Sequence, residues 1–402
     1  MIIYDIKKGI SYINMILIFD MKLIKNGLVY TMSDDIPKKL DILIDNDGFI
    51  LEIDKKIEGE YPFIDASGCN IYPGLIDAHT HLGIIESSIG YEGNDCNEYS
   101  DPITPHIRAI DGINILDESI KSANSAGITT VCCTPGSANV LGGQVCIYQT
   151  YGNSIDNALL NAYSAQKAAF GENPKRVYRD SKIKTRMQIA ALLRENLLKA
   201  NQYLNKKNFN KEDASKTYEY DMKMEALIPV LERKIPLKVH AHRADDILTV
   251  IRIAREFNID VTLEHCTEAH IIIEHVKDSG FPVIFGPTLT HKTKYELSNR
   301  SFNTVNALYD KAILFAITTD SPVIPLEYLP ICAGLAKKAG LTEIEALKTI
   351  TINPAKILKI DHLVGSIKKN KQADLVITDG DILNTTTKVL YTLIKGQVTY
   401  KL

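Results

Sequence analysis

The sequence lacks the features that mark a membrane protein or a nucleic-acid binder. No stretch approaches the roughly 18–20 consecutive apolar residues that a membrane-spanning helix needs. The net charge of −3 provides no basic surface for a phosphate backbone. We therefore expect no membrane partner and no nucleic-acid partner.

Paired cysteines are also missing. The seven cysteines are an odd number, are scattered through apolar or strand-like segments, and form no CxxC pair. Zinc ribbons and disulfide frameworks need cysteines in regular pairs, so neither is predicted. Free buried thiols are the simpler interpretation, and they favour a cytoplasmic location.

The composition is that of an ordinary globular protein, with 45% hydrophobic and 24% charged residues over 402 positions. Residues 21–72 and 364–402 consist of short strand-like runs separated by turns. Neither piece is long enough to cover both faces of a sheet, so we predict one small split β-sandwich domain from both chain ends.

Residues 1–20 precede the first predicted strand. This stretch has two early lysines followed by apolar residues, as in a weak signal peptide, but it lacks a small-residue cleavage site. Met21 stands directly before the strand. We interpret residues 1–20 as an N-terminal extension or as the product of a mis-assigned start.

Strand-like and helix-like segments alternate over residues 73–363, which is typical of a parallel sheet built from βα units. Eight such strands predict an α/β fold with a closed (β/α)8 barrel. The segment 84–115 is an excursion after the first strand and a candidate lid. The strands are predicted at 72–81, 128–134, 144–149, 159–167, 236–242, 259–265, 282–286 and 312–320, and the main helices at 182–204, 213–233, 245–257 and 342–358.

Two histidines end the first predicted barrel strand. His79 and His81 lie two residues apart, so both side chains share one face of the strand. Barrel active sites lie at the carboxyl ends of the strands, where two such imidazoles can form half of a metal site. An HxH pair alone is weak evidence, because such pairs are common.

Three other predicted strands also end in residues that commonly bind metals. His240 ends the fifth strand, His265 ends the sixth and Asp320 ends the eighth. Nitrogen and carboxylate ligands with an open position suit zinc or another divalent metal. The alternative is a set of core histidines bonded to backbone carbonyls, but five such residues at strand ends favour a metal.

The motifs PGLIDAHTHLG, VHAHR, LEHC and ITTDSPV, in this order, resemble those of the amidohydrolase superfamily, and most of all its imidazolonepropionase-related members. The resemblance extends over nearly all of the chain from Met21. It implies metal-dependent hydrolysis, a small-molecule substrate and a homo-oligomer. That subgroup also includes metal-dependent dipeptidases acting next to proline.

The resemblance also implies roles for single residues. His79, His81 and His240 would be metal ligands, and His265 a ligand or a substrate contact. Asp320 would be both a ligand and the general base. His242 would contact the substrate or the developing oxyanion, or else would be a hydrogen-bonding residue behind the ligands.

The fourth predicted strand leaves the metal count open. Family members with two metals carry a carbamylated lysine there, and Lys167 and Glu172 are the candidates in this chain. An uncarbamylated ammonium would repel two cations. The alternative is that Lys167 is a surface residue at the start of a loop. We expect one or two ions, zinc first, with iron or manganese as alternatives.

Three features bear on the substrate. Imidazolonepropionases carry an arginine after the HxH motif, whereas the corresponding loop here has acidic residues and no arginine, which argues against that reaction and hints at a cationic substrate. Arg243 is a candidate for anion recognition because it follows VHAH at the barrel mouth. His291, after the seventh strand, is a candidate substrate contact.

Together these features predict hydrolysis of an amide or cyclic amide by metal-activated water. A prolidase-like dipeptidase and a heterocycle deaminase are the enzymatic alternatives. A barrel used only as a scaffold is less favoured, because all five core ligand positions are filled.

Overall fold

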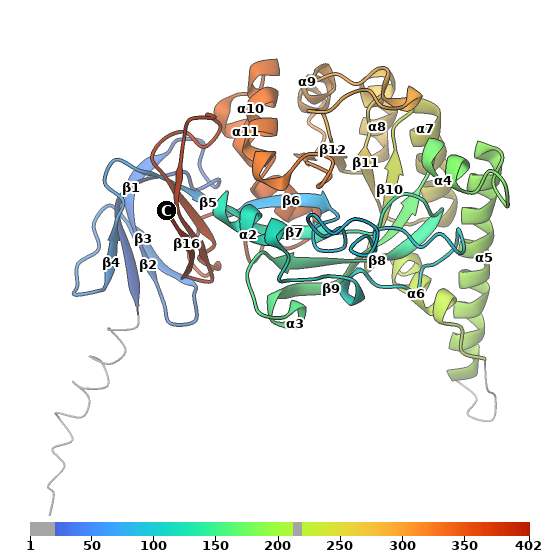
Figure 1. The fold of residues 1–402 in the computed structure, drawn as a ribbon, viewed down its shortest axis with the longest axis horizontal. Coiled ribbons are helices and arrows are strands. Elements are labelled where there is room, and N and C mark those ends of the chain that lie inside the picture. The colour runs from blue at the N-terminus through green and yellow to red at the C-terminus, as the bar shows by residue number, and fades with distance from the viewer. Residues whose placement is uncertain (1–20, 212–218) are drawn as a thin grey trace, which may run out of the picture.

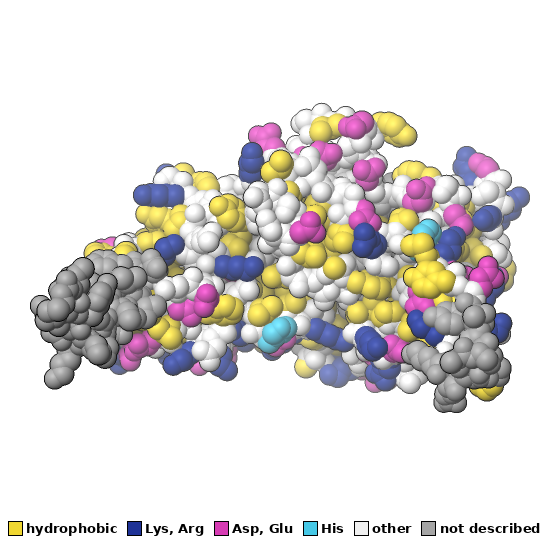
Figure 2. Space-filling view, turned by 90° about the horizontal axis from the view of Figure 1, so that it is seen from below, with side chains coloured by type: hydrophobic (Ala, Val, Ile, Leu, Met, Phe, Trp, Pro, Cys, Tyr) yellow, Lys and Arg dark blue, Asp and Glu magenta, His cyan; other side chains and the backbone are white. Residues whose placement is uncertain are grey.

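The computed structural model describes residues 21–211 and 219–402, which form two eight-stranded sheets flanked by helices (Figure 1). The predicted extension 1–20 and the first part of the predicted helix 213–233 lie outside the described residues. No helix among the described residues combines the length and the apolar character needed to cross a membrane. On the face shown in Figure 2, basic and acidic side chains are interspersed.

The first sheet combines strands from both ends of the chain. Its order is β16-β15-β14-β5-β1-β2-β3, with β4 paired to β1. β5 joins the two parts, because it runs parallel to β1 and antiparallel to β14. The strands are β1 (Lys22–Val29), β2 (Lys38–Ile44), β3 (Ile50–Asp54), β4 (Phe63–Asp65), β5 (Asn70–Pro73), β14 (Leu375–Thr378), β15 (Val389–Ile394) and β16 (Gln397–Lys401).

Aliphatic side chains from these strands form one buried cluster, which includes Ile24, Ile42, Ile71, Leu375 and Leu393. The two chain ends therefore share a core. The exact domain boundaries and the sandwich arrangement remain predictions.

The second sheet forms a nearly closed barrel in the order β6 to β13. Between its two edges, the Asp77 carboxylate accepts hydrogen bonds from the hydroxyls of Thr318 and Thr319. The strands are β6 (Leu75–Thr80), β7 (Ile128–Cys133), β8 (Leu141–Gln149), β9 (Leu159–Ala169), β10 (Leu237–Ala241), β11 (Val261–His265), β12 (Val283–Phe285) and β13 (Phe315–Ile317).

We expected a barrel of parallel strands with a helix after each strand, and for β8 this expectation is wrong. This strand runs antiparallel to both β7 and β9. A parallel neighbour requires a crossover of a dozen or more residues. The connection from β7 is a short loop, and the connection to β9 contains only the one-turn helix α3 (Ile155–Ala158).

The first predicted strand, 72–81, is two strands that belong to different sheets. It divides at Gly74, where a Cβ atom would lie 2.1 Å from the Thr129 hydroxyl oxygen. β5 ends before this glycine and β6 begins after it. The close approach lets the chain pass directly from the first sheet into the barrel.

The predicted helix 342–358 is likewise two helices, α11 (Glu343–Lys348) and α12 (Ile352–Ile357). Pro354 lies in the first turn of α12, where its missing N–H is tolerated, whereas inside one continuous helix it would remove a backbone hydrogen bond. The predicted helix 213–233 begins at Met222, where the Asp221 side chain caps α6.

The other helices surround the barrel (Figure 1). They are α2 (Glu118–Ser125), α4 (Glu172–Val177), α5 (Arg186–Lys211), α6 (Met222–Leu231), α7 (Ala244–Phe257), α8 (Ile273–Ser279), α9 (Asn303–Asp310) and α10 (Leu329–Ala339), with 3-10 turns η1 (Ala109–Asp111), η2 (Ala269–Ile272), η3 (Tyr295–Leu297) and η4 (Leu326–Tyr328).

Candidate metal centre and active site

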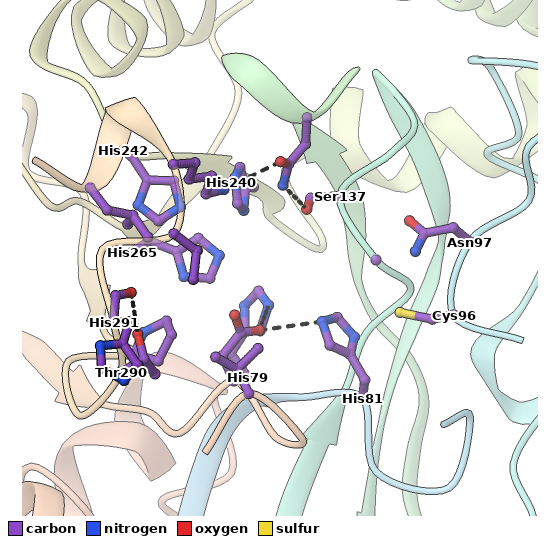
Figure 3. A pocket seen from close by; sticks show the side chains of 18 of the residues that line it. His79, His81, Cys96, Asn97, Ser137, His240, His242, His265, Thr290 and His291 are labelled. Atoms are coloured by element: carbon purple, nitrogen blue, oxygen red, sulfur yellow. Dashed lines mark hydrogen bonds and ion pairs between the residues drawn. The ribbon is translucent and has the colours of Figure 1, made fainter. Parts of the chain in front are cut away.

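Six of the predicted site residues converge at one end of the barrel. They line a cavity of about 580 Å³, together with His242 and His291. The imidazole rings from β6, β10 and β11 gather around a common space (Figure 3), and the ring centres of His240 and His265 are 4.4 Å apart. The six are His79, His81, Lys167, His240, His265 and Asp320.

Hydrogen bonds at Nδ1 orient three of the histidines. Nδ1 of His79 lies 2.6 Å from Glu264 Oε2, that of His81 lies 2.6 Å from the Thr134 carbonyl, and that of His265 lies 2.7 Å from the Gly286 carbonyl. An acceptor at Nδ1 fixes the tautomer in which Nε2 carries a lone pair. The free nitrogens are therefore available as ligands.

Several of these atoms are buried without a hydrogen-bond partner. Among the described residues they include Nε2 of His240, Nε2 of His265 and Oδ1 of Asp320. Leaving a buried polar atom unpaired costs roughly 1–3 kcal/mol. The ligand atoms of His79, His265 and Asp320 lie within 4.8 Å of one another, as do those of His240, His242 and His265. This donor set fits a divalent cation.

Unusual backbone conformations shape the site. His265 and Asp320 have positive φ values of 69° and 55°. Strand alternation alone would turn Glu264 and His265 to opposite sides. The left-handed conformation at His265 ends β11 and lets both side chains reach the His79 region. Such strain in non-glycine residues is concentrated at functional sites.

Lys167 lies inside β9 and is fully buried, so its interpretation as a surface residue is wrong. Its Nζ lies 3.3 Å from His79 Nε2. Burial lowers the pKa of Lys167 to about 8. The neutral form of this amine is therefore a minor species near pH 7, but far more populated than in an exposed lysine.

Burial also keeps the neighbouring histidines neutral. It lowers the pKa of His240 and of His242 well below the usual range, and that of His265 to about 4. Burial alone would raise the pKa of Asp320, but His265 and His81 outweigh it and lower this pKa. The centre thus offers neutral imidazoles at His240, His242 and His265 and an ionised carboxylate at Asp320, which are the forms that bind cations. His81 differs, because burial alone would lower its pKa, but Cys96 and Asp320 outweigh this effect and raise the pKa to about 10.

Charged residues behind the ligands were missed by the sequence analysis. Lys238 and Glu264 are buried, with Nζ and Oε2 2.9 Å apart, and Glu264 also holds His79. The register pairs Lys238 with Lys167 and His240 with Glu264, so all four lie on one face of the sheet. The sequence offered one indication of these residues, because each of the barrel strands β10 and β11 contains a charged residue among apolar ones.

A second buried pair lies in the segment after β12. Lys294 Nζ contacts Glu296 Oε1 at 2.6 Å, and this oxygen lies 3.8 Å from Nε2 of both His240 and His242. No pattern in the sequence distinguished these two residues from an ordinary solvated loop.

Two expectations about the substrate pocket need revision. Arg243 does not line the cavity and instead pairs with Asp245, with Nε 3.0 Å from Oδ1. The loop after the HxH motif contributes Cys96 and Asn97 to the cavity rather than its carboxylates. The hint of a cationic substrate therefore loses its basis. The acidic side chains concerned are Glu86, Glu92, Asp95, Glu98 and Asp101.

Comparison with known proteins identifies the class. A family model described as the amidohydrolase family matches residues 70–399. The solved structure of an amidohydrolase from Thermotoga maritima MSB8 is 39% identical and superposes with a TM-score of 0.92, covering 94% of this chain and 100% of that one. The chain belongs to the amidohydrolase family.

Two curated relatives are more distant. Amidohydrolase tasK of Hapsidospora irregularis is 29% identical over 376 residues, which are 85% of this chain and 38% of that protein. The imidazolonepropionase of Picrophilus torridus is 26% identical over 79% of this chain and 80% of its own length. This chain therefore spans about two-fifths of tasK but most of the imidazolonepropionase.

Proposed function

We propose that this protein hydrolyses a carbon–nitrogen bond of an amide or cyclic amide with the help of a divalent metal. The observation that carries the proposal is the convergence of buried, unpaired ligand atoms at the end of one cavity, above all Nε2 of His240 and of His265. The similarity to an imidazolonepropionase supports this type of reaction.

His79, His81, His240, His265 and Asp320 would hold the metal. Zinc is the first candidate, with iron and manganese as alternatives, because imidazole and carboxylate suit all three. A divalent ion bound there would polarise the scissile carbonyl and make its bound water more acidic.

Asp320 would accept the proton of the attacking water and return it to the leaving nitrogen. Its lowered pKa supports this role, because the group is an ionised base at neutral pH. Nδ1 of His242 lies 2.8 Å from the Thr267 hydroxyl, which orients its ring so that Nε2 can contact the substrate carbonyl oxygen.

Lys167 would help to hold two ions as a carbamate, which forms when its neutral amine adds CO2 and releases a proton. Its burial, its contact with His79 and its lowered pKa support this role, since carbamylation requires a neutral amine and removes the buried positive charge. Two ions per chain are therefore the arrangement that we propose. The cytoplasmic location and the homo-oligomer remain predictions.

The first experiment is metal analysis by mass spectrometry on protein purified without added metal or chelator. We expect about two equivalents per chain, reduced to about one in Lys167→Met. His265→Asn should also lose metal, whereas His275→Asn, which replaces an exposed histidine on α8, should not.

Assays with amides and cyclic amides then test the reaction. Cleavage of dipeptides would instead indicate a dipeptidase, and release of ammonia would indicate a deaminase. Less than a tenth of an equivalent, with no binding of added zinc, manganese or iron, would overturn the proposal.

A further inference from the structure

One part of the cavity wall outside the metal centre carries hydrogen-bond donors and a cation, whereas Pro287, Leu289 and Val323 make another part apolar. Among the described lining residues, Asp320 is the only carboxylate, and it lies at the metal centre. Lys294 lines the outer wall, together with Asn97, Ser137 and Asn173. A ligand in this part of the cavity meets the ammonium group of Lys294, while the carboxylate that balances its charge, Glu296, does not line the cavity.

Lys294 is held in place from behind. Its Nζ contacts Oε1 of Glu296 at 2.6 Å and donates to Oδ1 of Asn173 at 3.3 Å. Glu296 is 1% exposed and also accepts the backbone N–H of Glu172 at 3.0 Å, so the carboxylate is fixed. The ammonium thus donates one hydrogen bond, to Asn173, and is ion-paired with Glu296, so it keeps donor capacity for the cavity.

The neighbouring side chains of Ser137 and Asn97 also have hydrogen-bond donors without an acceptor among the described residues. Ser137 Oγ accepts from Asn173 Nδ2 at 2.8 Å, and Asn97 Oδ1 accepts from the Ala138 N–H at 2.9 Å. Within the described part of the chain, nothing accepts the Ser137 hydroxyl proton or the Asn97 amide protons. The unused hydrogen-bonding capacity of these side chains thus includes donors, which suit an anionic oxygen group.

We propose that Lys294, assisted by Ser137 and Asn97, binds an anionic oxygen group of the substrate, so that the substrate is a small amide that also carries a carboxylate. This inference rests on the proposed function and adds the substrate class. The Glu296 oxygen that holds Lys294 is 3.8 Å from Nε2 of both His240 and His242. The anion would therefore bind close to the reacting bond, which favours a short substrate.

Three hydroxamates separate this inference from the proposed function, because their common head binds metal and only their tails differ. The probes are succinic acid monohydroxamate, its terminal amide and the corresponding terminal phosphonate. Titration calorimetry on the metal-loaded protein should show the carboxylate binding roughly tenfold or more tightly than the amide, as a charge-assisted hydrogen bond implies. The phosphonate tests whether phosphate-like groups are preferred.

Lys294→Gln should reduce the preference for the carboxylate to within about threefold, and Lys294→Arg should restore part of it. Lys292→Gln is the matched control, since this exposed lysine of the same loop does not line the cavity. Acetohydroxamate, which has no tail, should bind wild type and Lys294→Gln equally and so report an intact metal centre.

Equal binding of the carboxylate and the amide by the wild-type protein would overturn the inference and leave the metal centre standing. Tighter binding of the phosphonate than of the carboxylate would overturn the assigned substrate class. If no hydroxamate bound the metal-supplemented protein, the proposed function would fail, and the inference with it.

Discussion

The two sheets of this protein bury different kinds of side chain. The first sheet, which both chain ends build (the terminal sheet), has a core of hydrocarbon side chains such as those of Ile24, Ile42 and Leu375, although Asp374, next to Leu375, is buried as well. The barrel end buries Lys167, Lys238 and Glu264 beside the cluster of histidines. Burying charge is unfavourable unless partners compensate for it, whereas burying apolar surface stabilises the fold. The comparison teaches that one sheet contributes stability and that the other holds reactive groups in place.

The largest expected effect is on catalysis at the barrel end. Asp320→Asn removes the proposed base with little change in shape, and it should reduce kcat by a factor of about 10²–10⁴. The measurement is steady-state hydrolysis of the best amide substrate, with the melting temperature as the control for folding. Activity within threefold of wild type would exclude Asp320 as the base.

The next effect separates stability from the site. Leu375→Ala removes a fully buried side chain from the terminal sheet and should lower the free energy of unfolding by about 2–5 kcal/mol. Urea denaturation measures this change, and Leu402→Ala, at an exposed position, should alter it by less than about 0.5 kcal/mol. The metal content of folded Leu375→Ala should remain that of wild type. Loss of metal would show that the two sheets are coupled.

A smaller effect, on metal affinity, is expected from residues that contact the proposed ligands but do not themselves bind the metal. Glu264→Gln weakens the contact that orients His79 and breaks the ion pair with Lys238, so metal affinity should fall roughly 10–100-fold. Competition with a chelator measures the affinity. Glu256→Gln replaces an exposed glutamate paired with Arg194 and should leave the affinity unchanged. An equal loss in both variants would contradict the role of Glu264.

The smallest effect is a pH dependence in the terminal sheet. Burial raises the pKa of Asp374 to about 6. Between about pH 4 and 6 the folded state keeps a proton that the unfolded state has released, so this group makes stability fall as pH rises. The slope is at most about 1.4 kcal/mol per pH unit.

Asp374→Asn should remove this contribution, and Asp47→Asn, at an exposed position in the turn after β2, should not. Urea denaturation at pH 4, 5, 6 and 7 tests both variants. An unchanged slope in Asp374→Asn would exclude this group as its origin.

The positions of the candidate metal ligands could be predicted because their types and spacing are local features of the sequence. His79 and His81 lie two residues apart at a strand end, and His240 follows an apolar run, so strand geometry alone directs them to the barrel end. The family model confirms the resemblance that these motifs suggested.

The burial of Lys167 was harder to predict from sequence. The first six residues of β9 are partly buried or exposed and only its last five residues are buried, so the segment as a whole resembles a surface strand. Lys294 and Glu296 lie in a long loop, whose conformation depends on contacts with distant residues such as Asn173 and Glu172. Antiparallel β8 was missed although its connections are too short for parallel pairing.

The pairing of β5 with β14 has a consequence for how the protein folds. Tyr72 and Val376 are register partners, although nearly the whole barrel lies between them in the sequence. Such non-local contacts slow folding, because a long loop must close before they form. During synthesis β5 is made long before β14, so the edge that it offers to β14 stays unpaired until β14 has been made. The strands β14, β15 and β16 can therefore join the first sheet only after β1 to β5 are available to pair.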